Sequence, residues 1–346
     1  MAAVDDYFAR TGLTRDGGPG MWTKSAVLVT WAVASWALLV FWAGSWWVAA
    51  PLAVSLGLAL AGVSFAVMHD GNHGAYSRRR LLNTAAGSTM EVMGGSSHVW
   101  KHKHNVLHHT WPNVEDVDDD IELRPFFRLT DGQPLRWMHR FQHIYWVPLF
   151  SLFTSKWIFV DDYLALARGA VGGHAMARPR GLGLVAFAAG KLSFLVWGVA
   201  IPLLCVPLLP YLLGYAIAAS VWGLTMGLVF QLAHAIHGVE VVLRPGPELP
   251  RPWAEHQLAT TADFARGNRL LTWYVGGLNH QVEHHLFPGV CHRHYPAIAG
   301  IVREVCATRG IVPHEHPTVL SALRAHLRHL RRLGAPTEPA PVPVAA

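Results

Sequence analysis

The distribution of charged and apolar positions divides this chain around two long apolar blocks. Residues 25–68 contain no charged side chain, and residues 181–233 contain a single one, Lys191. At about 1.5 Å of rise per residue, either block is too long for one helical crossing of a hydrocarbon core of about 30 Å. Each block therefore predicts a hairpin of two membrane-spanning helices. The expected helices are residues 25–43 with 48–68, and residues 182–204 with 211–233.

Two hairpins return the chain to the same side of a membrane each time, so the segments outside them share one face. The far-side turns contain no Lys or Arg, whereas the shared face carries Arg78, Arg79, Arg80, Lys101, Lys103, Arg124 and Arg128. By the positive-inside rule the shared face, with both termini, is cytoplasmic. The predicted divisions are a cytosolic segment 1–24, a first hairpin 25–68, a cytosolic segment 69–180, a second hairpin 181–234, a cytosolic region 235–334 and a disordered tail 335–346.

Two further segments have amphipathic or mixed patterns. Residues 135–160 are rich in aromatic side chains but contain Arg140, Pro148 and Lys156, which favours an interfacial helix or a re-entrant segment over a span. Residues 317–333 carry leucines at helical spacing opposite several arginines, which predicts a basic amphipathic helix. The leucines are Leu320, Leu323, Leu327, Leu330 and Leu333.

Composition supports the membrane assignment. The chain is 52% hydrophobic and 14% charged, with a mean hydropathy of +0.26, whereas about a quarter of a soluble domain is charged. The formal net charge of +6 comes from basic residues that flank apolar spans. Such residues suit anionic lipid headgroups, so we expect a lipid bilayer and no nucleic acid as a partner. The three cysteines have no CxxC spacing, which fits a reducing cytoplasmic side.

Histidines cluster next to the predicted span ends. His69 and His73 stand four residues apart directly after the second span, and His104 and His108 repeat that spacing with His109 beside them. On a helix, residues four apart project from one face. His284 and His285 form a pair downstream, and His234 ends the fourth span. The candidate metal ligands are therefore His69, His73, His104, His108, His109, His234, His284 and His285.

Eight imidazoles are too many for one ion, so the set predicts two metal ions. Neutral imidazole suits iron, copper and zinc, and the residues alone leave this choice open. The segments contain no cysteine, which argues against an iron–sulfur cluster or a structural zinc ribbon. His98 and His102 share the four-residue spacing, but no paired imidazole follows them. The predicted fold is thus an all-α integral membrane protein, with four transmembrane helices in two hairpins and a cytosolic helical cap that carries a histidine-ligated dimetal site.

Metal-bound imidazoles need hydrogen-bond acceptors that orient the rings. Proximity in sequence points to Asp70, Asp263 and Glu283, and the acidic run 115–120 is a further candidate or else a solvated loop. His237 follows His234 by three residues and is a candidate for an extra ligand or a supporting residue.

Three motifs resemble those of the membrane fatty acid desaturase superfamily, most closely its front-end acyl desaturases, including bacterial linoleoyl-CoA desaturase-like proteins. They are the first histidine box His69-Asp70-Gly71-Asn72-His73, the second box within 100–109, and the third box within Gly276-Gly277-Leu278-Asn279-His280-Gln281-Val282-Glu283-His284-His285-Leu286-Phe287-Pro288. Gln281 stands where many desaturases have a first histidine, as in the front-end type, and is a possible ligand or supporting residue. Gln231-Leu232-Ala233-His234 resembles the family's additional ligand segment. The resemblance covers roughly residues 7–312.

The resemblance implies a di-iron centre, held by the eight histidines, that uses O2 to introduce a cis double bond into a fatty acyl-CoA or acyl-lipid chain. It implies no catalytic side chain beyond the metal ligands. Front-end desaturases often carry a fused cytochrome b5 domain with a His-Pro-Gly-Gly motif, which is not found in this sequence. We therefore expect an external electron donor of the ferredoxin or cytochrome b5 type. The Ala- and Arg-rich composition suits a bacterial cell membrane.

Several side chains are candidates for an acyl tunnel. Trp100, Trp111, Trp146, Trp273 and Tyr274 either line it or anchor the protein at the interface. Lys191 either snorkels, pairs with a partner, or faces the substrate channel.

Two other functions are compatible with the pattern. A hydroxylase or related oxygenase on the same scaffold would share the ligand boxes, because both reactions can start with hydrogen abstraction. A membrane metal transporter or sensor is the second alternative. Transporter sites normally lie near the bilayer midplane on broken helices, whereas these boxes lie beyond the span ends.

Overall fold

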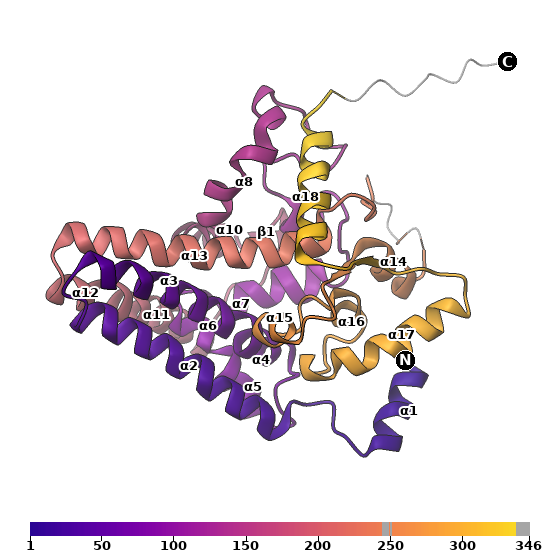
Figure 1. Ribbon diagram of the computed structural model, residues 1–346, viewed down its shortest axis with the longest axis horizontal. Coiled ribbons are helices and arrows are strands. Elements are labelled where there is room, and N and C mark those ends of the chain that lie inside the picture. Colours follow the sequence, from indigo (N-terminus) through magenta and orange to yellow (C-terminus); the bar gives the residue numbers. More distant parts are fainter. Residues whose placement is uncertain (244–248, 250, 337–346) are drawn as a thin grey trace.

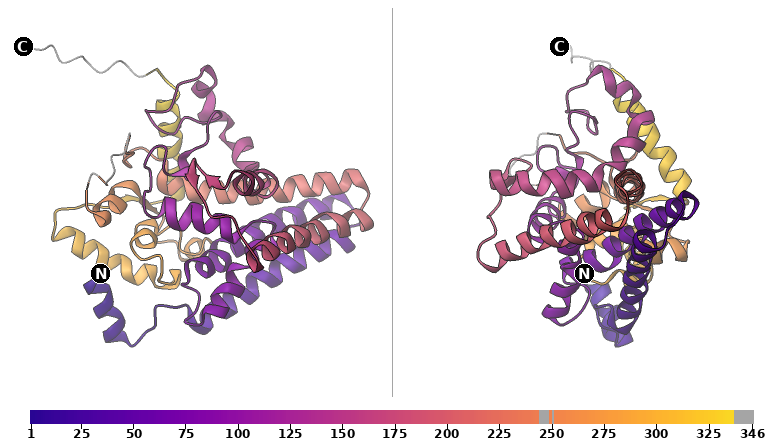
Figure 2. Two further views of the ribbon diagram at one scale, coloured as in Figure 1. Left: turned by 180° about the vertical axis from the view of Figure 1, so that it is seen from behind. Right: turned by 90° about the vertical axis from the view of Figure 1, so that its left-hand side faces the viewer.

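Four long apolar helices form the bundle from which the rest of the chain is built (Figure 1). The structure is a computed structural model that describes residues 1–243, 249 and 251–336. The four helices, Gly18–Phe41, Trp46–His73, Leu182–Cys205 and Leu208–His234, are each long and apolar enough to cross a membrane. The prediction of four helices that could span a membrane is therefore confirmed. Figure 2 shows the hairpin turns at one end of the bundle, and most of the residues after the fourth long helix at the opposite end.

The first hairpin is longer than its apolar pattern predicts. It consists of α2 (Gly18–Phe41) and of one continuous helix made by α3 (Trp46–Val63), the π-helical segment η1 (Ser64–Met68) and α4 (His69–His73). Helix α2 begins seven residues before the predicted start because Pro19 suits a first helical turn and the buried Lys24 has a partner, His292. The first histidine box is thus the last turn of the second long helix, and Met68 is not the end of that helix.

The second hairpin agrees closely with the prediction. Its first helix comprises α11 (Leu182–Phe194), η6 (Leu195–Ala200) and α12 (Ile201–Cys205), and its second is α13 (Leu208–His234). Helix α3 packs against both α2 and α13 and so lies at the centre of the bundle. The core between these helices includes the buried Leu28, Leu60 and Trp222. Trp47, at the turn of the first hairpin, is 88% exposed, as expected for a side chain that faces lipid or its interface.

The segment between the hairpins contains short helices and one small hairpin. Its elements are α5 (Arg80–Gly87), α6 (Thr89–Val92), α7 (Ser97–Trp100), η2 (Lys101–His108), η3 (Asp119–Ile121), η4 (Trp137–Phe141), α8 (Gln142–Ser151), α9 (Phe153–Lys156), η5 (Trp157–Asp161), α10 (Asp162–Arg168), and the antiparallel strands β1 (Ala170–Val171) and β2 (His174–Ala175). The aromatic-rich region 135–160 forms η4 to η5, and α8 packs on α13. Trp137 and Ile144 are exposed there, so an interfacial position of this region stays a prediction.

The region after the fourth long helix covers the end of the bundle opposite the hairpin turns (Figure 1). It contains α14 (Trp253–Thr260), β3 (Ala262–Phe264), α15 (Arg269–Tyr274), α16 (Gln281–Leu286), η7 (His292–His294), α17 (Tyr295–Ala307), β4 (His314–His316) and α18 (Val319–Leu333). Strands β3 and β4 are parallel, and α17 packs against the N-terminal helix α1 (Ala2–Thr11). Of the tail predicted to be disordered, residues 337–346 lie outside the described residues.

The C-terminal amphipathic helix has a different buried face from the one that its leucines predict. Leu330 and Leu333 of α18 are buried, but Leu320 is exposed. His326 and His329 are buried instead, because their ring nitrogens hydrogen-bond to the backbone oxygens of Ala235 and Leu129. A hydrogen-bonded imidazole is compatible with a core position.

Lys191 forms a buried ion pair inside the bundle. Its Nζ donates to Asp162 Oδ2 at 2.7 Å and to the backbone oxygens of Gly94 and Ile158 at 2.6 and 3.1 Å. Three acceptors match the three protons of an ammonium group. Of the three roles considered for Lys191, the structure therefore shows pairing with a partner, and this pair joins α11, α10 and the loop after α6.

Removal of one member of this pair should destabilise the fold. Lys191→Met leaves the fully buried Asp162 carboxylate without its cation, which should cost about 3–5 kcal/mol of unfolding free energy. The exposed pair Lys156–Asp161 offers a matched control, since Lys156→Met should cost less than about 1 kcal/mol. Thermal unfolding in detergent tests this difference. The double variant Lys191→Met/Asp162→Asn should be more stable than Lys191→Met alone, and equal losses for Lys191→Met and Lys156→Met would contradict the assignment.

Gly71, in the first histidine box, permits close packing of α4 on α5. A Cβ at this position would meet the backbone nitrogen of Gly87, and it would lie 2.8 Å from the carbonyl carbon of Ala86. Backbone atoms cannot give way as a flexible side chain can. The glycine therefore allows α4 to lie where His69 and His73 face the interior.

Gly71→Ala should force α4 and α5 apart at a cost of about 1–3 kcal/mol, typical of overpacking. Gly289→Ala is the control, because a Cβ at Gly289 has open space. Circular dichroism melts of the two variants should separate them. A Gly71→Ala protein as stable as Gly289→Ala would show that the helix contact is not tight.

Candidate metal centre

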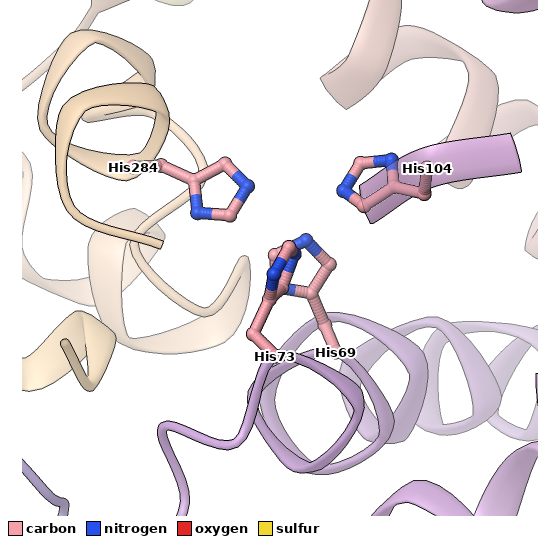
Figure 3. Close-up of side chains that lie close together, drawn as sticks. All are labelled: His69, His73, His104 and His284. Atoms are coloured by element: carbon pink, nitrogen blue, oxygen red, sulfur yellow. The ribbon is translucent and has the colours of Figure 1, made fainter. Parts of the chain in front are cut away.

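Three separate elements bring four imidazoles together at the end of the bundle. His69 and His73 project from the last turn of α4, His104 from η2 and His284 from α16. One ring nitrogen of each lies within 4.8 Å of the others. Figure 3 shows the four rings pointing into one shared space from three directions. Such a convergence of nitrogen donors suits a transition-metal ion.

A second group of imidazoles lies beside the first. His108, His234 and His285 also have ring nitrogens within 4.8 Å of one another. His109 lies between the two groups: its ring centroid is 4.4 Å from that of His285 and 4.6 Å from that of His284. The structure thus places seven of the eight predicted ligands in two adjacent groups, with the eighth, His109, between them. Both lie at the end of the bundle opposite the hairpin turns (Figure 1).

A π-helical turn arranges the second box. The sequence suggests an α-helical spacing, in which His104 and His108 share a face. Instead, η2 is a π-helix, and the backbone N–H of His109 donates to the His104 oxygen five residues earlier. The wider turn lets His104 face the first group and His108 the second, with His109 between them. π-helical turns are frequent at functional sites.

Three of the imidazoles have one nitrogen held and the other free. His108 Nδ1 lies 3.0 Å from Asp118 Oδ2, His284 Nδ1 3.1 Å from Tyr295 Oη, and His285 Nδ1 2.8 Å from Gln257 Oε1. Their Nε2 atoms are buried and, among the residues that the structure describes, have no hydrogen-bond partner. Buried polar atoms without a partner are costly. A cation bound at these nitrogens would satisfy them, so the residues fit the metal ions that the boxes imply.

The electrostatics of the site keep most of these rings neutral. Burial lowers the pKa of His104, His109, His284 and His285 well below the usual value for histidine. A neutral imidazole is the form that binds a metal. For His108, burial also opposes the charged form, but the neighbouring Asp118 carboxylate outweighs it and raises the pKa of His108. The same carboxylate would strengthen the basicity of His108 as a ligand.

Two members of the acidic run 115–120 lie against ligand candidates: Asp118 hydrogen-bonds to His108, and Asp120 Oδ2 lies 3.6 Å from His108 Nδ1 and 3.8 Å from His104 Nδ1. Asp118 makes the closer contact. Its carboxylate also accepts from the backbone N–H groups of Asn113 and Asp120, at 2.8 and 3.0 Å, which fixes its position. Lys103 pairs with the neighbouring Asp119 and Asp120. Part of the run is therefore buried support for the second box rather than a solvated loop.

The other candidates for supporting roles lie at different distances from the rings. The Gln281 side-chain nitrogen is 2.9 Å from His234 Nε2, so Gln281 contacts a ligand candidate. Asp70 accepts from His292. Asp263 and Glu283 form a separate buried cluster with His280, and Asp263 accepts from the backbone N–H of Val282. Asp263 therefore supports the start of α16, and in the described part of the chain neither carboxylate joins the two groups of imidazoles.

Two other sequence candidates lie apart from the imidazole groups. His237 is exposed, because the chain leaves α13 at His234 and turns toward the surface. His98 bonds to the Ala177 oxygen through its Nε2. Neither residue joins the two groups within the described part of the chain.

Aromatic side chains line one side of the imidazole groups. Trp100 stacks on His104 with ring centroids 4.3 Å apart, and Phe230 stacks on His234 at 5.1 Å. Trp100 is thus the one tunnel candidate that touches box imidazoles. The others lie elsewhere: Trp111 is half-buried after the second box, Trp146 packs on Phe150 and His326, Trp273 lies under Lys24, Tyr274 donates to the Leu58 oxygen, and Lys191 is in its ion pair.

An apolar cavity of about 110 Å³ lies among the four long helices. Its lining includes Leu60, Phe194 and Trp222 toward the imidazoles, and Ala49 and Val206 toward the hairpin turns. The six tunnel candidates are not among the described residues that line it. Leu60 precedes His69 by nine residues, so the cavity begins about 13 Å along the helix from the first box.

Four residues of this centre do not follow from the sequence motifs: Tyr295, Gln257, His292 and Phe230. Each lies outside the boxes and reaches them through the tertiary fold. The position of Phe230 could have been predicted, because it stands four residues before His234 on the same helix and so lies on the same helix face. Tyr295 and Gln257 are uncharged and lack a spacing relation to the boxes, so the sequence contains no comparable signal for them.

Comparison with known proteins identifies the family of this chain. The family model described as "Fatty acid desaturase" matches residues 44–317. The chain is 34% identical to an sn-1 linoleoyl-lipid 6-desaturase of Arthrospira platensis over 339 residues, which cover 95% of this chain and 90% of that protein. A protein of the same name from a Synechocystis species is 34% identical over 96% of this chain and 93% of its own length. An acyl-lipid (8-3)-desaturase of Physcomitrium patens is 35% identical over 96% of this chain and 70% of its own. With its four apolar helices and two groups of imidazoles, this chain belongs to the fatty acid desaturase family.

Proposed function

We propose that this enzyme is a front-end acyl-lipid desaturase that uses a di-iron centre and O2 to introduce a cis double bond. The observation that carries the metal part of this proposal is the pair of adjacent imidazole groups with unpartnered, buried ring nitrogens. The substrate class is supported by relatives whose names describe desaturation of acyl lipids. Gln281 at the first position of the third box supports the front-end type.

The residues of each group would hold one iron. His69, His73, His104 and His284 would hold the first, and His108, His234 and His285 the second, with His109 between them. The two irons, when bound, supply activation of O2 and the oxidising strength needed to remove hydrogen from an unactivated methylene. The net reaction converts –CH2–CH2– and O2, with two electrons and two protons, into –CH=CH– and two molecules of water.

The protein's own residues orient the ligands and exclude bulk water. Asp118, Tyr295 and Gln257 hold the Nδ1 atoms of three rings, which fixes the direction of each Nε2. Trp100 and Phe230 cover the rings on their apolar side. Trp100 and Phe230 would also hold the reacting substrate carbon next to the metal site. Binding would then have met the entropy cost of positioning that carbon before the reaction begins.

The apolar cavity would hold the methyl end of the acyl chain. It is lined almost entirely by apolar side chains from the long helices and begins about 13 Å from the first box. A chain can reach it only when many carbons lie on the methyl side of the reacting bond. Desaturation near the carboxyl end leaves such a long methyl segment, so the depth of the cavity supports front-end regioselectivity.

The proposed reaction also needs an electron donor, and the protein needs a defined orientation in the membrane. The sequence contains no His-Pro-Gly-Gly haem motif, and we infer a separate ferredoxin or cytochrome b5-type donor. The imidazole groups would face the cytoplasm of a bacterial cell, with the basic residues at that end of the bundle against the anionic leaflet.

Expression in a host that supplies linoleoyl lipids and a ferredoxin system tests the activity. Gas chromatography with mass spectrometry should detect a fatty acid two mass units lighter than its precursor, with the new bond on the carboxyl side of the existing ones. His108→Ala should abolish the product, because it removes a ligand and strands the Asp118 carboxylate. His237→Ala, an exposed histidine, should leave the product in place.

A product sixteen mass units heavier would contradict desaturation and favour a hydroxylase. Iron that binds without any O2 consumption across acyl lipids and acyl-CoA would contradict both.

Filling the cavity should shorten the preferred acyl chain. Ala219 lines the cavity on α13, whereas Ala216, on the same helix, is exposed. Ala219→Leu should lower the rate on eighteen-carbon chains relative to sixteen-carbon chains by about tenfold, because one or two added carbons are worth 1–3 kcal/mol in an apolar site. Competition between the two chain lengths measures the ratio. Ala216→Leu is the matched control, and the same ratio in both variants would show that the methyl end lies elsewhere.

A further inference from the structure

The segment 291–295, which follows the third box, reaches two of the elements that bear metal ligands. His292 of this segment contacts Asp70, which lies between the two histidines of the first box. Tyr295 of the same segment contacts His284 of the third box. Both contacts lead to the same group of four imidazoles, His69, His73, His104 and His284.

The hydrogen bonds of His292 fix which nitrogen carries its proton. Lys24 Nζ lies 2.7 Å from His292 Nε2, and Asp70 Oδ2 lies 2.8 Å from His292 Nδ1. An ammonium group has only protons to give, so Nε2 must accept. The proton of His292 is therefore on Nδ1 and is donated to the Asp70 carboxylate. All three side chains are buried, so this chain is shielded from competing water.

The contacts among Lys24, His292 and Asp70 fix the rotational orientation of α4, which carries the first box, about its helix axis. Asp70 is next to His69 and three residues before His73 on α4. The His292 backbone N–H also points to the same Asp70 oxygen, at 3.4 Å. A carboxylate anchored from outside the helix fixes the direction in which the neighbouring side chains project. His292 itself is no metal ligand here, since both ring nitrogens are already used by Lys24 and Asp70.

Tyr295 acts on the third box directly. Its Oη lies 3.1 Å from His284 Nδ1, and the ring is almost fully buried. A ligand imidazole whose Nδ1–H is accepted by Tyr295 presents Nε2 to the shared space. His292 is the first residue of η7, and Tyr295, three residues later, is the first residue of α17. Displacement of this short segment would therefore disturb both histidine-bearing elements together.

The other imidazole group is supported from different places. Asp118 holds His108, Gln257 of α14 holds His285, and Gln281 contacts His234. His285 is next to His284 in sequence, yet its Nδ1 partner comes from a different element. The two groups therefore share the histidine boxes but not the residues that orient them.

We propose that His292 and Tyr295 are positioning residues for one of the two metal sites, the one formed by His69, His73, His104 and His284. This inference rests on the proposed di-iron centre. It assigns a positioning function to segment 291–295, which lies outside the histidine boxes. It also predicts that different substitutions lower the metal affinity of the two sites. Loss of an orienting partner typically lowers metal affinity about 10–100-fold.

The test uses the purified full-length protein, reconstituted anaerobically with ⁵⁷Fe²⁺ and challenged with a chelator of graded concentration. Iron per chain and the Mössbauer spectrum are measured at each step. Wild type should hold two irons. Tyr295→Phe should release one iron at a chelator concentration about 10–100-fold lower and keep the other unchanged. Asp118→Asn should release the other iron first, with a different residual spectrum. The double variant should release both early.

Two controls separate orientation from a general loss of structure. Tyr145→Phe removes a phenol hydroxyl that donates to the Phe126 oxygen, far in sequence from the boxes, and should keep both irons. His292→Asn keeps an N–H donor near the position of Nδ1, whereas His292→Leu removes it. The asparagine variant should therefore hold its first iron more tightly than the leucine variant, at equal thermal stability.

The iron measurements distinguish failure of the proposed di-iron centre from failure of the positioning role of His292 and Tyr295. A wild-type protein that binds no iron contradicts the di-iron centre and this inference with it. A wild-type protein with two irons, whose release is unchanged in Tyr295→Phe and His292→Leu, contradicts only this inference. The inference is also overturned if Tyr295→Phe loses both irons together, or if it loses the iron that Asp118→Asn loses.

Discussion

An imidazole ring can present one nitrogen to a metal in a fixed direction only when its other nitrogen is held. This constraint underlies the arrangement at the end of the bundle. Asp118, Tyr295 and Gln257 each hold an Nδ1 atom, and the corresponding Nε2 atoms converge in the buried interior. The three partners come from three different parts of the chain. The tertiary fold is therefore required to orient the imidazoles that the histidine boxes supply.

Two buried lysines join the long helices to the short segments that pack on them. Lys191 gives its three protons to three acceptors, and Lys24 donates to a histidine that in turn donates to Asp70. In an apolar environment an unpaired ammonium group would be expensive. Both lysines therefore sit where short segments of the cap meet a long helix, and each fixes the position of a segment whose sequence alone has weak structural preferences.

The sequence predicts the four apolar helices and the set of histidines that the fold brings together, because both leave local signals. The absence of charge over 25–68 and 181–233 reveals the two hairpins, and histidine spacing reveals the boxes. The π-helical turn at His104 to His109 has no such signal, because its extra residue per turn results from packing. The partners Tyr295 and Gln257 are equally hidden, since an uncharged side chain far from a box in sequence gives no hint of contact. For the aromatic residues considered for an acyl tunnel, the sequence signal was present but ambiguous. Aromatic character alone does not distinguish a cavity wall from a contact between helices, and Trp146 and Tyr274 make helix contacts.

The uninterrupted helix from Trp46 to His73 sets the depth of the centre in the bilayer. Its 28 residues extend about 42 Å, whereas the hydrocarbon core is about 30 Å thick. With Trp46 and Trp47 at one interface, the opposite end of the helix emerges by roughly 10 Å, into the layer occupied by glycerol and headgroups. In this arrangement the first box would stand level with the ester linkages of membrane lipids. Under the proposed function, an acyl chain still attached to its glycerol would expose its first several carbons to the imidazole groups while its methyl end remained within the hydrocarbon.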